Sequence, residues 1–203
     1  MTPMFPLGSV LVPGMILPLH VFEPRYLQLV RDCTAGDGEF GVVLIARGSE
    51  VGGGDVRTDV GTVARIVQVD EMPDGRFAVG AVGLRRIRVE RWLDDDPYPR
   101  AEITDWPDVA PDPGTDLGTD ALGGLVRRAS ALHAELGEPA APVDIELSAD
   151  PVIAGYQAAL AVPFGPADRQ DVLGAPSVAE RVALLRELLD DHLLVLEARL
   201  GGT

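Results

Sequence analysis

The spacing of hydrophobic residues divides the chain into a β-rich first half and a helical second half. Up to Trp106 the apolar residues form short continuous or alternating runs that are typical of strands. After residue 118 they recur every three or four positions, as they do on one face of a helix. Residues 107–118 between the two halves are rich in Pro, Gly and Asp, which indicates a linker. The expected organisation is a β-rich domain over 1–106, a linker over 107–118 and a helical bundle over 119–203.

In the β-rich half the pattern predicts several strands and one short helix. The apolar segments 10–12, 16–19 and 40–45 are expected to be extended, and a last strand is expected over 98–103. The clearest hairpin joins 61–71 to 76–92 through Met72-Pro73-Asp74-Gly75, an order of residues that suits a type I turn. Between the second and third segments, Glu23-Pro24 predicts the start of a helix, because proline favours the first helical position.

The helical half is expected to contain four helices, over 120–136, 148–162, 168–173 and a long last segment that begins at Ser177. Ser148 is the predicted N-cap of the second helix, and Ser177 with Glu180 forms a capping box for the last. One apolar stripe follows the last helix at steps of three and four, made of Val178, Val182, Leu185, Leu189, Leu193, Leu196 and Leu200. We expect this stripe to pack on the other helices; a partner-binding face is the alternative.

Charge and composition narrow the classes of partner. All 17 basic residues are arginine, and 32 acidic residues give a net charge of −15. Such a surface repels phosphate backbones and anionic lipid, so we expect no nucleic-acid or membrane partner. A single cysteine, Cys33, excludes an intrachain disulfide, and the proline-interrupted N-terminus is neither a signal peptide nor a spanning helix. A cytoplasmic location is therefore expected.

The residues offer little catalytic or metal chemistry. Without lysine there is no P-loop lysine, no Ser-Lys dyad and no Schiff base, and the glycine run at 52–54 predicts a loop rather than a phosphate cradle. His20, His133 and His192 do not have metal-ligand spacing, so neither a metal site nor a cofactor is expected. Cys33 is expected to be a buried structural thiol, although its spacing leaves a Cys–His nucleophile open. No catalytic residue is therefore predicted.

Three blocks resemble one known family. The N-terminal run from Phe5-Pro6-Leu7 through Pro13-Gly14 to 17–26 (LPLHVFEPRY) resembles the opening of the N-terminal, substrate-binding domain of the Lon proteases. The segments 61–66 (GTVARI), 73–76 (PDGR) and 83–87 (GLRRI) are similar to the second block of that domain. The segment 168–173 (DRQDVL), followed by Glu180-Arg181 and a leucine-rich helix, resembles the third. The blocks follow the family's order over nearly the whole chain.

The resemblance implies a fold of class α+β. It consists of a twisted, partly closed β-barrel of PUA-like type with one short helix, followed by a helical bundle. The resemblance also implies a role in engaging protein substrates. The sequence stops after the bundle, so a standalone form without the ATPase and peptidase domains is expected, and it is not expected to be an enzyme even though family naming would suggest a peptidase.

The favoured function is therefore a non-catalytic module that binds unfolded or apolar protein segments, as an adaptor or chaperone-like binder that could work with a protease or a chaperone. The alternatives are a PUA-like RNA-binding protein, which would need more positive charge than the cluster Arg85, Arg86 and Arg88 supplies, and a metal-free hydrolase. The oligomeric state is left open. The candidate peptide-binding residues are Leu19, Phe22, Tyr26, Met72, Phe77 and Arg86.

The candidate site rests on the corner between the second predicted strand and the helix. Phe22 and Tyr26, with the nearby hairpin residues Met72 and Phe77, could line an apolar groove, because aromatic and methionine side chains bury large areas without demanding one sequence. The competing interpretation is that the aromatic side chains belong to the core, with Glu23 and Arg25 serving as a cap and a surface ion pair.

Overall fold

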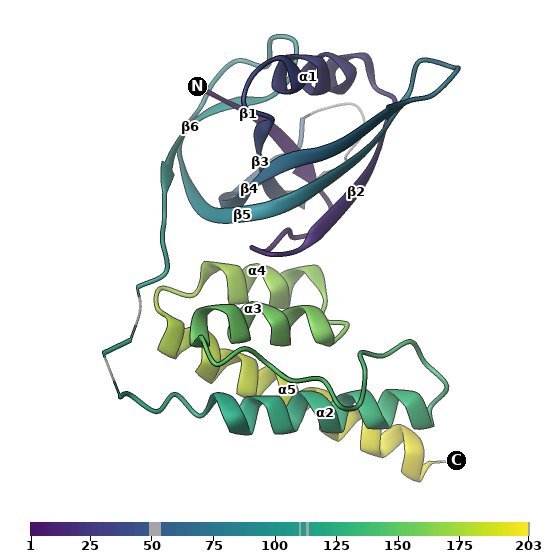
Figure 1. The fold of residues 1–203 in the computed structure, drawn as a ribbon, viewed down its shortest axis with the longest axis vertical. Helices are drawn as coiled ribbons and strands as arrows, with labels where there is room; N and C mark the ends of the chain where they lie inside the picture. The colour runs from purple at the N-terminus through teal and green to yellow at the C-terminus, as the bar shows by residue number, and fades with distance from the viewer. Residues whose placement is uncertain (49–53, 110, 113, 203) are drawn as a thin grey trace. The chain divides into compact units, whose positions relative to one another are not determined.

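A computed structural model describes residues 1–48, 54–109, 111–112 and 114–202. It divides into two compact units, Met1–Pro107, here called the β unit, and Asp108–Thr203, the helical unit (Figure 1). Among the described residues, the first unit contains all six strands and one helix, and the second contains four helices. The predicted glycine-loop residues 52 and 53, and residues 110 and 113 of the predicted linker, lie outside the described residues, so the extent of the linker stays a prediction.

The β unit is built on one mixed six-stranded sheet. Its strands are β1 (Thr2–Leu7), β2 (Ile16–Val21), β3 (Glu39–Arg47), β4 (Val56–Glu71), β5 (Phe77–Trp92) and β6 (Arg100–Asp105). They follow the order β2-β5-β4-β3-β1-β6, and an additional pairing of β5 with β6 curls the sheet back on itself. The five strands β1, β3, β4, β5 and β6 thus form a ring, while β2 pairs only along the first part of β5. This confirms a partly closed, rather than a clean, barrel.

The first strand differs from the prediction. The structure places it at Thr2–Leu7, parallel to β3, whereas the predicted extended segment 10–12 is buried but forms no strand. Proline is unusual inside a sheet, so Pro3 and Pro6 argued against a strand here. Pro6 lies opposite Val43 of β3. On the other edge of β1, the pairing with β6 covers Thr2 and Pro3 and does not reach Pro6, so a proline is tolerated there.

The hairpin and the short helix follow the sequence prediction. The turn at Met72–Gly75 is closed by the Met72 N–H, which donates to the Arg76 carbonyl at 2.8 Å, and Gly75 adopts a left-handed φ of 81°. Helix α1 (Pro24–Ala35) begins with Pro24 in its first turn and ends at Gly36. Its buried face, which includes Tyr26, Leu29 and Cys33, joins the core of the β unit and covers one end of the sheet (Figure 1).

The helical unit contains α2 (Thr119–Glu135), α3 (Pro151–Ala161), α4 (Pro166–Gly174) and α5 (Val178–Gly201). Ser177 caps α5 as predicted, since its hydroxyl accepts a hydrogen bond from the Glu180 N–H at 3.2 Å. The N-cap of α3 is Asp150 rather than the predicted Ser148, and its carboxylate accepts from the Val152 N–H. The reason is Pro151, which holds the residue before it in the extended conformation that an N-cap needs.

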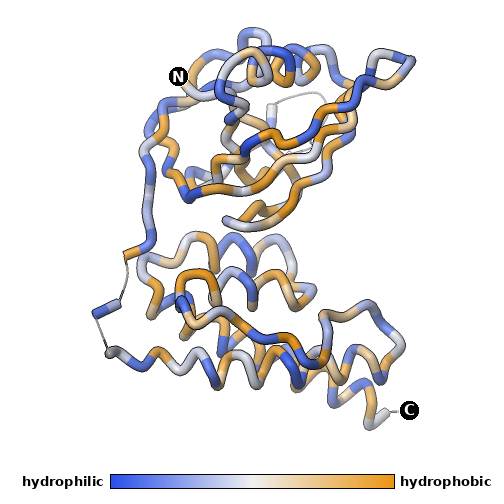
Figure 2. Tube along the Cα trace, in the orientation of Figure 1, coloured by the Kyte–Doolittle hydropathy of each residue, from blue (hydrophilic) through white to orange (hydrophobic). Residues whose placement is uncertain are grey.

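The apolar stripe of α5 belongs to the hydrophobic core of the helical unit, as the sequence predicted. Six of its seven residues are at most 4% exposed and belong to one cluster with the buried faces of α2 and α3, and only Leu200 at the end is partly exposed. In Figure 2, hydrophobic and hydrophilic segments alternate along the helices of the helical unit. The stripe therefore has its partners within the helical unit, and the alternative of a partner-binding face at the stripe is wrong.

Two histidines meet between helices α2 and α5. The Nε2 atoms of His133 and His192 lie 2.8 Å apart, a distance that needs one shared proton, and His133 Nδ1 lies 2.8 Å from the Glu138 carboxylate. Burial, with the neighbouring His133 adding to it, lowers the pKa of His192. The Glu138 carboxylate orients the His133 ring through its other nitrogen. No group of three or more metal-ligating side chains occurs in the described part of the chain.

Candidate functional site: the β2 pocket

A pocket of about 260 Å³ opens between the end of β1, the strand β2 and the start of α1. We call it the β2 pocket. Its lining consists of Phe5, Leu7 and Ser9 from the first strand and the loop after it, residues 17–23 of β2 and the corner after it, and Tyr26 of α1. Small-molecule sites usually measure about 300–1,000 Å³. The β2 pocket lies at the small end of this range.

The floor of the pocket is aromatic. The rings of Phe5 and Tyr26 stack with centroids 4.1 Å apart and an interplanar angle of 17°, and Phe40 packs against Phe5 from the core at 6.1 Å. Tyr26 is only 4% exposed, and burial raises the pKa of its hydroxyl to about 12. The tyrosine therefore stays neutral at physiological pH and offers an apolar ring to the pocket.

The rim of the pocket is formed by the strand-to-helix corner. Alternation along β2 turns Leu17, Leu19 and Val21 inward, and Leu19 stays half-exposed in the pocket wall. Phe22 follows the strand with 54% of its side chain exposed, an unusual position for a phenylalanine. It thus provides a large apolar surface at the mouth of the pocket that no core contact requires.

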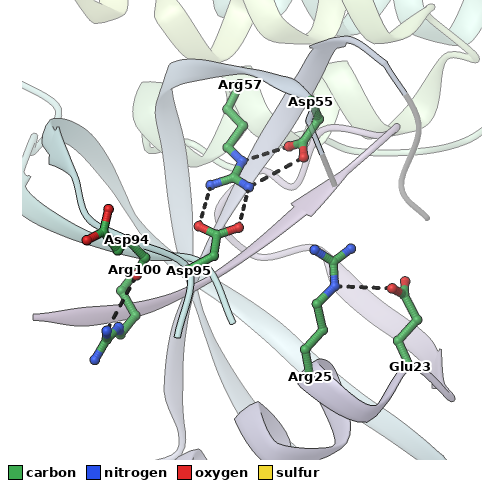
Figure 3. Close-up of polar contacts among 7 residues, drawn as sticks. All are labelled: Glu23, Arg25, Asp55, Arg57, Asp94, Asp95 and Arg100. Atoms are coloured by element: carbon green, nitrogen blue, oxygen red, sulfur yellow. Dashed lines mark hydrogen bonds and ion pairs between the residues drawn. The ribbon is translucent and has the colours of Figure 1, made fainter. Parts of the chain in front are cut away.

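Charged residues at and near the pocket form two sets of ion pairs. Glu23 accepts from Arg25 Nε at 3.1 Å, and the Arg25 guanidinium lies 4.5 Å from the centre of the Tyr26 ring. Arg57 bridges Asp55 and Asp95, with shortest distances of 2.7 and 3.0 Å (Figure 3). Burial alone would raise the pKa of Asp55, but the hydrogen bonds from Arg57 outweigh it and lower that pKa. The charges of both sets are therefore paired.

The six candidate residues separate into two sets. Leu19, Phe22 and Tyr26 line the β2 pocket together. Phe77 is 6% exposed and borders a different, apolar hollow against Val30 and Val69, while Met72 is half-buried at the hairpin turn.

Arg86 also lies outside the β2 pocket. It is 2% exposed, and its guanidinium lies 4.1 Å from the ring of Trp106, on which Arg88 also lies at 3.8 Å. Sequence reasoning missed Phe5, Leu7 and Ser9, because the first strand was not predicted.

The Cys33 thiol and the Arg85 guanidinium each make contacts within the β unit. Cys33 is buried, its Sγ donates to the Glu39 carbonyl at 3.4 Å, and burial raises the pKa of the thiol to about 12. Arg85 pairs with Glu39 and Asp105 at 2.8 and 2.9 Å. Within the described residues, no helix combines the length and the hydropathy needed to cross a membrane.

Comparison with known proteins identifies the domain. The family model for the substrate-binding domain of ATP-dependent protease La (LON) matches residues 1–191. Lon protease 2 of Myxococcus xanthus is 32% identical over 196 residues, or 93% of this chain, and Lon protease of Cytophaga hutchinsonii is 26% identical over 206 residues, or 97%. The chain covers 23% and 25% of the lengths of these two relatives.

Solved structures of Lon N-terminal domains are similar to this chain over most of its length. The Lon N-terminal domain protein from Xanthomonas campestris superposes with a TM-score of 0.66 at 32% identity and covers 92% of this chain and 96% of its own. The N-terminal domain of the Mycobacterium avium complex Lon protease gives 0.65 at 19% identity, covers 94% and 98%, and supports the fold alone. The matched domain is non-catalytic, and these 203 residues do not include the protease domain. The chain therefore belongs to the family of Lon substrate-binding domains.

Proposed function

We propose that the chain binds exposed apolar segments of other proteins in the β2 pocket, without catalysing a reaction on them. The observation that carries this proposal is Phe22, an aromatic side chain 54% exposed at the mouth of a pocket whose floor is the Phe5–Tyr26 stack. Aromatic side chains bury large apolar areas and tolerate different partner sequences. The membership of a substrate-binding family supports a protein as the ligand.

Unfolded segments are the ligands that such a surface favours. A disordered client loses conformational entropy when it binds, so the affinity is modest and the binding reversible. We propose that the protein acts in this way as an adaptor or chaperone-like binder in the cytoplasm, presenting clients to a protease or a chaperone. The net charge of −15 favours neutral or basic clients over acidic ones.

RNA binding is the weaker alternative. The basic cluster on β5 is engaged within the β unit, since Arg85 pairs with two acids and both Arg86 and Arg88 lie over Trp106. Phosphate contacts need clustered, available positive charge, and each contact makes binding more sensitive to salt. The observed contacts therefore favour a protein ligand.

Replacing Phe22 by serine is expected to weaken binding of an unfolded protein about tenfold, because about 1.4 kcal/mol of apolar contact is lost at the pocket mouth. Binding is measured by fluorescence anisotropy with reduced, carbamidomethylated ribonuclease A, a basic chain held unfolded by its blocked cysteines. The free energy of unfolding should change by less than about 1 kcal/mol, as is typical of an exposed position.

Val67→Ser is the matched control, because Val67 is 64% exposed but does not line the β2 pocket. It should leave the affinity unchanged. Equal affinities for the unmodified chain and both variants would show that the unfolded client binds elsewhere, and absence of binding to the unmodified chain would reject the proposed function.

A further inference from the structure

The outer edge of β2 is an unpaired strand edge beside the β2 pocket, whose floor is aromatic. In the described residues β2 pairs with β5 on one side, and no other strand joins it. Across the pocket, β1 is paired with β3 through Leu7, and its pairing with β6 ends at Pro3. The sheet is thus incomplete at the β2 pocket, where residues of both strands form the lining.

The register determines which backbone groups of β2 face outward. The Gly83 N–H donates to the Met15 carbonyl at 2.9 Å, and Met15 opposite Gly83 continues the register of β2 on β5. Because hydrogen-bonding direction alternates along an antiparallel pair, Leu17, Leu19 and Val21 turn their backbone groups toward β5. Ile16, Pro18 and His20 turn theirs to the free edge. The position of Pro18 agrees with this assignment, because a proline within a paired strand needs its nitrogen on the unpaired side.

From these observations we infer that the chain binds its client by strand addition: an extended, apolar segment of an unfolded protein pairs with the free edge of β2 and places alternate side chains in the β2 pocket. This inference rests on the proposed function and specifies how the client is held. The groups available to the client are the N–H and C=O of Ile16 and His20 and the C=O of Pro18. Main-chain hydrogen bonds supply affinity with little dependence on sequence, while the pocket selects apolar side chains.

The charge of the chain favours a client over a second copy on this edge. Two copies would each bring a net charge of −15. Pro18 removes one outward donor, and prolines on edge strands are a common protection against edge-to-edge pairing. A client with basic residues beside its apolar segment is not repelled by this charge and brings no proline of its own to the edge. Since Pro18 shortens the ladder, we expect weak, reversible binding.

The test removes one outward N–H, and a second variant accounts for the His20 side chain that the pocket loses. His20→Pro eliminates the only outward-facing N–H between Pro18 and the end of β2, and His20→Ala is the matched control that keeps the N–H and loses the imidazole. The probe is a fluorescent peptide of about eight residues, alternating valine and threonine with an arginine at each end. Binding should be about five- to tenfold weaker in His20→Pro than in His20→Ala, the effect of losing about one hydrogen bond beyond the loss of the imidazole.

A second measurement leaves the protein unaltered, so that a folding defect of His20→Pro cannot decide the result. The same peptide is N-methylated either at its odd or at its even residues. Strand addition predicts that one of the two methylated peptides binds at least about tenfold more weakly than the other, because only one set of amides faces β2.

The outcomes separate the two proposals. If the proline variant and both methylated peptides bind like their controls, strand addition is wrong and side-chain binding in the pocket stands. If the unmodified chain binds neither the peptide nor unfolded ribonuclease A, both proposals are wrong. If sedimentation shows a dimer of the unmodified chain that His20→Pro dissociates, a second copy occupies the edge and the client assignment is overturned.

Discussion

Arg181→Met is expected to lower the free energy of unfolding of the helical unit by about 3–5 kcal/mol, since it breaks a buried ion pair from one side. Arg181 is fully buried, and its Nη2 lies 2.5 Å from the Asp108 carboxylate. Its Nε donates to the Val172 carbonyl at 3.2 Å, and its guanidinium lies 4.3 Å from the ring centre of Tyr156. Methionine would fill much of the space but leave the carboxylate and the carbonyl without these donors.

Urea unfolding followed by far-ultraviolet circular dichroism measures the loss. Arg128→Met is the control, because Arg128 pairs with Glu197 while 61% of its side chain is exposed, and such pairs contribute at most about 1 kcal/mol. Similar small losses in both variants would mean that the Arg181 pair contributes no more than a surface pair. The same contact holds Asp108, the second residue of the predicted linker, within the helical unit.

Phe77→Ser is expected to lower the free energy of unfolding of the β unit by about 3–5 kcal/mol, the range for truncating a core aromatic residue. The ring is 6% exposed, Phe77 lies opposite Val21 of β2, and the Arg31 guanidinium lies 5.5 Å from the ring centre. The measurement is urea unfolding monitored by tryptophan fluorescence from the β unit, which contains both tryptophans, Trp92 and Trp106.

Phe22→Ser is the comparison for this variant, with an expected loss below about 1 kcal/mol at its exposed position. A neutral effect of Phe77→Ser, together with lost client binding, would return Phe77 to the binding surface. The expected contrast would instead restrict the surface to the strand-to-helix corner.

Local sequence signals predicted the elements whose determinants are local. The Met72–Gly75 turn, the proline start of α1 and the capping serine of α5 each depend on neighbouring residues, and the structure has all three. The first strand escaped prediction because its partner, β3, follows a second strand and a helix, and pairing of that kind leaves no local pattern.

For the candidate site, too, the sequence predicted the part that depends on neighbouring residues and not the part that depends on distant contacts. Leu19, Phe22 and Tyr26 come together because a strand followed directly by a helix brings them to one corner. Phe77 and Arg86 lie elsewhere because packing against α1 and Trp106 determines their positions, and neither contact is encoded nearby in sequence. Likewise, His133 meets His192 and Arg181 meets Asp108 only once the helices have packed.

Hydrogen–deuterium exchange of single amides, with and without unfolded ribonuclease A, tests the central claim most directly. Exchange reports whether a backbone N–H is hydrogen-bonded. The account predicts that the client slows exchange at Ile16 and His20, whose amides face the free edge of β2, while the amides of Leu17 and Leu19, already directed toward β5, change little. Binding of the client with protection confined to other strands or to the helical unit, and none at Ile16 and His20, would contradict the account.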